Sequence, residues 1–299
     1  MFARPLLASL IALALLPAPA QAQDAADMAE LLRQRLAERL KDKPDAKPEA
    51  KADTKAAAPK AAPKKKPEGA AHGTAHWGYT GEGAPERWAE LSPEFRTCAT
   101  GTRQSPIDIR EGIRVDLEKI DFAYRPSRFS VLDNGHTIQV NVAPGNTLGV
   151  MGRRFELQQF HFHKPSEERI NGKLFDMVAH LVHRDAEGKL AVVAVLLERG
   201  SAQPLVQTIW NNLPLEKGED LPAPGNIDLN QLLPEDRAYF TYMGSLTTPP
   251  CSEGVLWMVM RQPVQISNDQ LNIFGRLYPM NARPLQAGSG RLIKESLGP

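Results

Sequence analysis

Short strand-like runs, several of which alternate apolar and polar residues, dominate the chain from about residue 76 onward. They include TIQVNV (137–142), FELQQFHFH (155–163), FDMVAHLVH (175–183), LAVVAVLLE (190–198) and VLWMVM (255–260). A period of two is typical of strands, whose successive side chains point to opposite faces of a sheet. Helical patterns are few and short, LVQTIWNNL (205–213) being one. These runs predict one β-dominated domain, which we place over residues 71–299.

Residues 23–75 have a different texture and contain no Phe, Trp or Tyr. The stretch DMAELLRQRLAERLKDK (27–43) has its apolar residues on one helical face, and Pro44 ends the pattern. The Ala-, Lys- and Pro-rich sequence that follows cannot bury enough apolar surface to fold. We therefore expect residues 23–70 to form a helical and disordered tail. Its helix is either a transient one, the simpler interpretation, or an element for self-association or partner binding.

The first 22 residues have the features of a secretory signal peptide. Arg4 supplies the positive charge, an apolar run covers residues 6–16, and small residues end at Ala22. The apolar run is too short to span a bilayer comfortably, so we expect cleavage near Ala22 and no stable membrane insertion. An uncleaved anchor is the alternative. The sequence thus predicts a periplasmic or secreted protein.

The net charge bears on the possible partners of the chain, and the cysteines bear on its redox compartment. The formal net charge of +1 gives no argument for binding nucleic acid, and we expect no such partner. Cys98 and Cys251 are the two cysteines of the chain. In an exported protein they favour a disulfide, with two separate thiols as the alternative.

Histidines recur at positions that share a strand face. Gln159, His161 and His163 lie on one face of their run, and His180 shares a face with Val182 in the next. If the two strands pair, the three histidines converge. Three neutral imidazoles with an open fourth position make a catalytic zinc site, whereas a structural site is usually closed by four ligands. Histidines satisfied within a core are the alternative.

Seven segments together carry a resemblance to a known family. They are HWGYTGEGAPERW (76–88), GTRQSPIDI (101–109), DNGHTIQV (133–140), QFHFHKPSEE (159–168), MVAHLVH (177–183), GSLTTPPCSEGVLW (244–257) and NARPLQ (281–286). In this order they closely resemble the alpha class of carbonic anhydrases, over about residues 76–298.

The resemblance implies the alpha carbonic anhydrase fold: a large, twisted, mainly antiparallel sheet with a few short helices. It also implies a lyase that interconverts CO2 and bicarbonate, releasing a proton, by means of a zinc-bound hydroxide. Two other functions are weighed against this one. A non-catalytic binding module on the same fold normally requires loss of a zinc histidine, and none is lost here. An interaction protein acting through residues 27–43 is compatible with the enzyme.

The resemblance places Zn²⁺ on His161, His163 and His180. It implies that Thr247 accepts the hydrogen of the zinc-bound hydroxide and donates its own to a buried Glu167. Such an arrangement fixes the direction of a lone pair on the hydroxide. The alternative for a threonine before two prolines is backbone capping.

His136 matches the proton shuttle of the family. An imidazole titrates near neutral pH and so can pass a proton to buffer. Asn134, Gln139 and Tyr79 would order the connecting water molecules. A solvated histidine in a turn is the alternative for His136.

The remaining residues implied by the resemblance line the substrate pocket. CO2 is apolar and requires a dry wall, and Thr248 would contact bicarbonate or an inhibitor. Sulfonamides and anions are the expected inhibitors. Ordinary core packing is the alternative for the apolar members of the wall, which are Val182, Val192, Leu246, Val255 and Trp257.

Zinc-bound histidines usually donate their second ring nitrogen to a fixed acceptor. Gln159 is placed to serve His161, and the chain around Asn281 offers a carbonyl to His163.

For His180 the sequence departs from the family. Val178 stands where the family usually has a glutamate. Glu168 and Asp176 are the nearby carboxylates, and a water molecule or a backbone carbonyl are the other candidates. We expect zinc affinity or turnover to be lower than usual in consequence.

Overall fold

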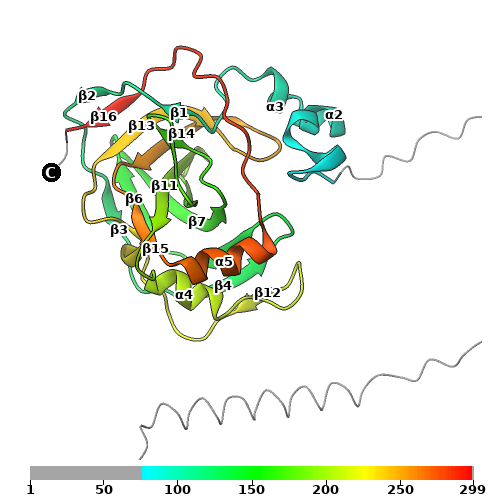
Figure 1. Cartoon of the computed structure of the whole chain (residues 1–299). Coiled ribbons are helices and arrows are strands. Elements are labelled where there is room, and N and C mark those ends of the chain that lie inside the picture. The colour runs from blue at the N-terminus through cyan, green and yellow to red at the C-terminus, as the bar shows by residue number, and fades with distance from the viewer. Residues whose placement is uncertain (1–75, 298–299) are drawn as a thin grey trace, which may run out of the picture. The chain divides into compact units, whose positions relative to one another are not determined.

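The computed structural model describes residues 76–297 (Figure 1). The predicted signal peptide, the helix at 27–43 and the linker after it lie outside these residues. Within the described range, no helix has the length and apolar character needed to cross a bilayer.

Within residues 76–297, a sheet of 13 strands forms the body of the domain, and three further strands form a small second sheet. Most neighbouring strands run antiparallel, but β11 pairs in parallel with β14 and β15. The expected fold class is therefore confirmed. The strands are β1 (Asp108–Ile109), β2 (Ile113–Val115), β3 (Asp121–Ala123), β4 (Phe129–Asp133), β5 (Ile138–Val142), β6 (Thr147–Val150), β7 (Arg153–His163), β8 (Arg169–Ile170), β9 (Lys173–Leu174), β10 (Met177–Arg184), β11 (Leu190–Arg199), β12 (Asp220–Pro222), β13 (Tyr239–Ser245), β14 (Glu253–Met260), β15 (Val264–Ile266) and β16 (Lys294–Ser296).

The centre of the large sheet is β5, β7, β10, β11 and β14, in that order. Strand β11 is apolar along nearly its whole length because both its faces are buried. One face, which includes Val193 and Val195, packs in the larger apolar cluster. The other, which includes Val192 and Ala194, packs in a second cluster with Trp257. The second cluster lies beside the histidines described below.

The helices are short, as the sequence predicts, and α4 matches the run at 205–213. Figure 1 shows α4 and α5 together on one side of the sheet, while α2 and α3 lie elsewhere. The Gln203 side chain caps α4, and a capping box of Ser267 and Gln270 begins α5. The helices are η1 (Gly81–Gly83), η2 (Pro85–Arg87), α2 (Trp88–Leu91), η3 (Pro93–Phe95), α3 (Thr97–Thr100), α4 (Pro204–Trp210), η4 (Leu229–Leu232) and α5 (Asn268–Leu277).

Cys98 and Cys251 form the expected disulfide, across a sequence separation of 153 residues. Cys98 belongs to α3, and Cys251 lies in the loop between β13 and β14. Trp88 is buried against the pair. The disulfide therefore ties the N-terminal helical segment to the loop that carries Thr247 and Thr248.

Candidate active site

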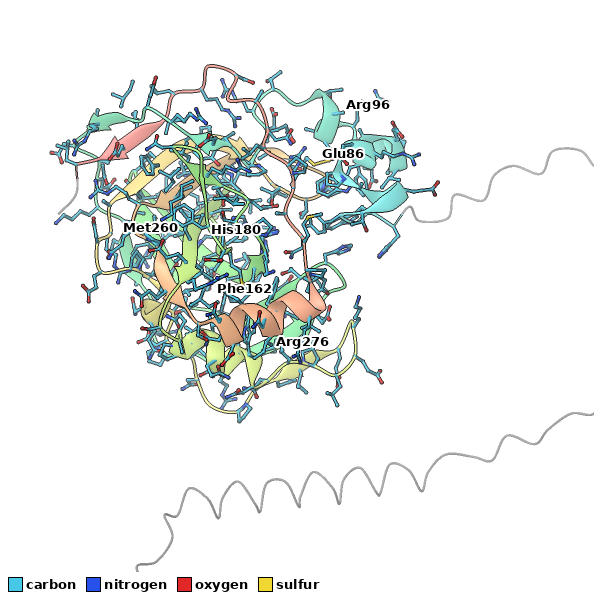
Figure 2. The ribbon with its side chains drawn as sticks, in the orientation of Figure 1. Glu86, Arg96, Phe162, His180, Met260 and Arg276 are labelled. Atoms are coloured by element: carbon cyan, nitrogen blue, oxygen red, sulfur yellow. A yellow bond between two sulfur atoms is a disulfide. The ribbon has the colours of Figure 1, made fainter. Side chains whose placement is uncertain are left out.

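The pairing of β7 with β10 brings the three predicted zinc ligands together. His180 lies directly opposite His161 in the antiparallel register, and His163 lies two residues farther along β7. The nitrogens that the three rings offer to a metal all lie within 4.8 Å of one another. Figure 2 shows His180 among the strands near the middle of the view, and its side chain is buried.

Two of the rings are oriented by fixed acceptors. Nδ1 of His161 lies 2.9 Å from the side-chain oxygen of Gln159. Nδ1 of His163 donates to the backbone carbonyl of Asn281 at 2.7 Å. In both rings Nε2 is left to face the point where the histidines meet.

The third ring has a carboxylate partner. Nε2 of His180 lies 3.0 and 3.2 Å from the two oxygens of Glu168, so its Nδ1 faces the other histidines. Asp176, the other carboxylate that the sequence suggested, pairs instead with Arg199. Val178 is buried in the second apolar cluster. The glutamate that the family usually has at position 178 is thus replaced by Glu168, which comes from a different segment of the chain.

The electrostatics of the cluster suit a cation. Burial, followed by the neighbouring His180, lowers the pKa of His161 to about 3, and the same causes lower the pKa of His163 well below its usual value. Burial also acts to lower the pKa of His180, but Glu168 and Glu167 outweigh it and raise the pKa. Nε2 of His163 is buried and has no hydrogen-bond partner among the described residues. Such an orphaned nitrogen, within reach of two others, fits a zinc ion.

Glu167 lies behind the histidines and is also buried. Burial raises its pKa to about 7 and the adjacent Glu168 adds to this, while His180, the Arg283 backbone N–H and the Thr247 hydroxyl act in the opposite direction. The Arg283 N–H donates to Oε1 at 2.8 Å. No hydrogen bond of good geometry reaches Oε2 within the part of the chain that the structure describes. Tyr79 lines a cavity that also touches Glu167, and it is not among the residues that line the cavity that opens onto the histidines.

A cavity of about 280 Å³ opens onto His161 and His180. Five of the six residues predicted to touch the substrate line it, together with Thr247, whereas Val255 lies behind them in the second apolar cluster. The sequence interpretation missed Gln158, Arg184 and Leu190, which also line the cavity. Arg184 shares a strand face with Val182, so the period of two could have identified it.

His136 is half-buried just before the start of β5, and its ring stacks on Trp77 with centroids 3.6 Å apart. Burial, followed by His76 and Lys217, lowers its pKa. Asn134 holds the turn by accepting from the His136 backbone N–H at 3.0 Å. The Asn134 amide also donates to Gln139 at 3.3 Å.

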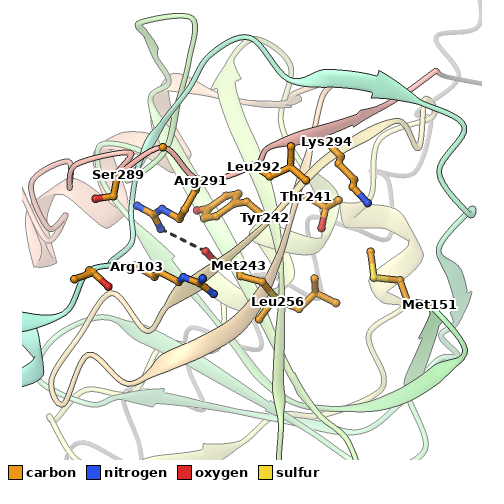
Figure 3. Close-up of a pocket in the computed structure, with 12 residues that line it drawn as sticks. Arg103, Met151, Thr241, Tyr242, Met243, Leu256, Ser289, Arg291, Leu292 and Lys294 are labelled. Carbon is orange, nitrogen blue, oxygen red and sulfur yellow. Dashed lines mark hydrogen bonds between the residues drawn. The ribbon is translucent and has the colours of Figure 1, made fainter.

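A larger cavity, of about 470 Å³, lies around β13, β14 and residues 289–294 (Figure 3). Arg103, Arg291, Met243 and Lys294 are among its lining residues, and Arg291 donates to the Met243 carbonyl at 3.5 Å. None of the residues predicted for the site lines it. The convergence of side chains, rather than cavity size, identifies the candidate site.

Three convergent histidines beside a partly apolar cavity form a candidate metal site. Residues 83–296 match the model of the eukaryotic-type carbonic anhydrase family. The chain is 46% identical over 222 residues to the carbonic anhydrase of Neisseria gonorrhoeae, covering 73% of this chain and 87% of that one. It is 44% identical over 227 residues to the carbonic anhydrase of Nostoc sp., covering 74% and 86%. The alpha-carbonic anhydrase of Thermovibrio ammonificans, solved with the inhibitor sulfanilamide, superposes with a TM-score of 0.72 at 42% identity, covering 75% of this chain and all of that one.

The chain belongs to the eukaryotic-type carbonic anhydrase family, as its sequence motifs predicted. It is an enzyme of the lyase class, of the family that hydrates CO2.

Proposed function

We propose that this enzyme hydrates CO2 at a zinc ion held by His161, His163 and His180. The observation that carries the proposal is the convergence of their three ligand nitrogens within 4.8 Å, with the second nitrogen of each ring near an acceptor. Zinc bound by three histidines supplies a Lewis acid that makes water a strong nucleophile near neutral pH, a property long established for carbonic anhydrases.

Thr247 and Glu167 orient the reacting oxygen in this proposal. Glu167 is held through its Oε1 by the Arg283 N–H, and the Thr247 hydroxyl is close enough to lower its pKa. A hydroxyl that donates to a fixed carboxylate leaves its own lone pair to accept from the reacting oxygen. Its direction is then set by the protein rather than by solvent.

The apolar part of the cavity receives CO2. Val182, Val192, Leu246 and Trp257 line the side near His180 and exclude water from that wall. Thr248 lies on the same cavity and supplies a hydroxyl for bicarbonate. Sulfonamides and small anions are the inhibitors that we propose for this cavity, by analogy with the sulfanilamide complex of the Thermovibrio ammonificans enzyme.

His136 carries the released proton to buffer. Its lowered pKa keeps the imidazole neutral, and therefore ready to accept a proton, at pH 7. Asn134 and Gln139, which are joined by a hydrogen bond, form the polar approach to the histidines, because Gln139 lies opposite His161 in the pairing of β5 with β7. Water molecules ordered there would connect the site to His136.

Zinc content and stopped-flow CO2 hydration, measured on the same sample, test the proposal. We expect one zinc per chain, loss of activity with a chelator and recovery on adding zinc. His180→Ala should lose both zinc and activity. His183→Gln is the matched control, because His183 lies on the same strand with its side chain on the opposite face, near Tyr124. Turnover that survives complete zinc removal, or full zinc without turnover, would refute the proposal.

We also propose that the protein is exported after cleavage near Ala22. The Cys98–Cys251 disulfide supports an oxidising compartment. Mass spectrometry of the protein recovered from periplasm and medium should give Gln23 as the first residue. Self-association through residues 27–43 stays a prediction, which size-exclusion chromatography with and without residues 23–70 tests.

A further inference from the structure

The loop before β8 places a buried carboxylate against His180. Glu168 is fully buried, and its two oxygens lie 3.0 and 3.2 Å from Nε2 of His180. No other hydrogen bond reaches these oxygens within residues 76–297. A buried carboxylate is costly unless it is paired, so this one is committed to His180.

The backbone holds Glu168 from both sides. Its carbonyl accepts from the Ser166 hydroxyl at 2.8 Å, and the next residue, Arg169, donates its N–H to the Ile107 carbonyl at 3.3 Å. Arg169 also begins β8, which pairs in parallel with β1 through Asp108. The carboxylate therefore approaches His180 from an anchored segment rather than from a free loop.

Position 178 carries a buried apolar side chain rather than a carboxylate. Val178 lies two residues before His180 on the same strand face and is fully buried. It packs in the apolar cluster that contains Val192 and Trp257. The carboxylate that the sequence resemblance places at 178 is thus absent there, and an apolar contact takes its place.

We propose that Glu168 is the positioning residue for His180, replacing a carboxylate at position 178, and that it sets how tightly the site holds zinc. Accepting the Nε2–H keeps Nδ1 of His180 unprotonated and directed at the metal, and the negative charge makes the ring a better ligand. The inference rests on the proposed zinc function, because it concerns the strength of that same site.

Zinc affinity and the zinc dissociation rate, measured by competition with a chromophoric chelator, test the inference. Glu168→Ala should raise the zinc dissociation constant by roughly 10- to 100-fold. Glu168→Gln, which keeps the shape and one acceptor oxygen but loses the charge, should give a smaller increase. Asp176→Asn is the matched control and should leave the constant unchanged, since Asp176 pairs with Arg199.

Two further measurements separate positioning from general damage. Circular dichroism and thermal unfolding of the zinc-free variants report whether each folds, and the isosteric Glu168→Gln keeps the test valid if Glu168→Ala does not. A proton NMR signal from the Nε2–H of His180 should be present in the zinc-loaded wild type and shifted upfield in Glu168→Gln. Constants for both variants within threefold of wild type would overturn the inference. A wild type that binds no zinc would instead refute the proposed function.

Discussion

The side chain of Asn281 connects the turn at His136 to the end of β7, and removing it should be costly. Its amide donates to the carbonyls of His136 at 3.1 Å and Phe162 at 3.0 Å, and its oxygen accepts from the Lys164 N–H at 2.8 Å. The residue is fully buried. The backbone carbonyl of the same residue orients His163.

The expected loss in the free energy of unfolding follows from these three hydrogen bonds. Each is worth a net of about 0.5–1.5 kcal/mol, and the Lys164 N–H loses the only partner that the described residues give it. We therefore expect Asn281→Ala to lower the free energy of unfolding by about 2–4 kcal/mol. With the urea sensitivity usual for a domain of this size, the midpoint should fall by roughly 1–2 M.

Urea unfolding of the zinc-free protein measures this change without a contribution from metal binding. Asn272→Ala on α5 is the matched control, because Asn272 is exposed and makes no side-chain hydrogen bond among the described residues. It should change the free energy of unfolding by no more than about 0.5 kcal/mol. A loss below about 1 kcal/mol for Asn281→Ala would refute the view that these bonds hold the site together.

Three further predictions concern catalysis, the disulfide and pH. Thr247→Val should lower kcat/KM for CO2 hydration about 100-fold while zinc affinity, measured on the same protein, stays at the wild-type value; loss of both would contradict the orienting role. Replacing Cys98 and Cys251 by alanine should lower the free energy of unfolding by about 3–5 kcal/mol, measured in urea, because the unfolded chain loses a long closed loop; an unchanged midpoint would contradict this. Burial lowers the pKa of His183 to about 3, so the unfolded state binds more protons than the folded state below about pH 6.5. The stabilisation is therefore present above that pH and is lost as the pH falls, at up to about 1.4 kcal/mol per pH unit for this one proton. In zinc-free protein, His183→Gln should reduce the slope by that amount, and equal slopes would show that the buried ring does not contribute.

The fold could be predicted from the sequence because its signals are local. The alternation in residues 155–163 and 175–183 defines β7 and β10, and the continuous apolar run at 190–198 is explained by burial of both faces of β11. The alternation also placed His161 and His163 on one face. It did not give the register, which depends on how β7 and β10 pair along their length.

The acceptors that orient the histidine rings were harder to predict, because two of them come from distant or irregular segments. Gln159 is two residues from its histidine and follows from the pleat. The carbonyl of Asn281 is 118 residues from His163, and only the family resemblance pointed to it. Glu168 could be named only as one of two nearby carboxylates, beside a water molecule or a backbone carbonyl, because its direction depends on the backbone of the loop after β7.

The His180–Glu168 pair has a consequence for how such enzymes are recognised and how they diverge. A search pattern that demands an acidic residue two places before the third histidine would discard this chain, although the imidazole keeps a carboxylate. Moving that carboxylate between positions 168 and 178 requires two substitutions. The step with neither acid leaves a buried N–H without its acceptor, and the step with both crowds two negative charges around one ring. The effect of either substitution should therefore depend strongly on the other, and the two arrangements should be separated by a fitness valley rather than by a neutral path.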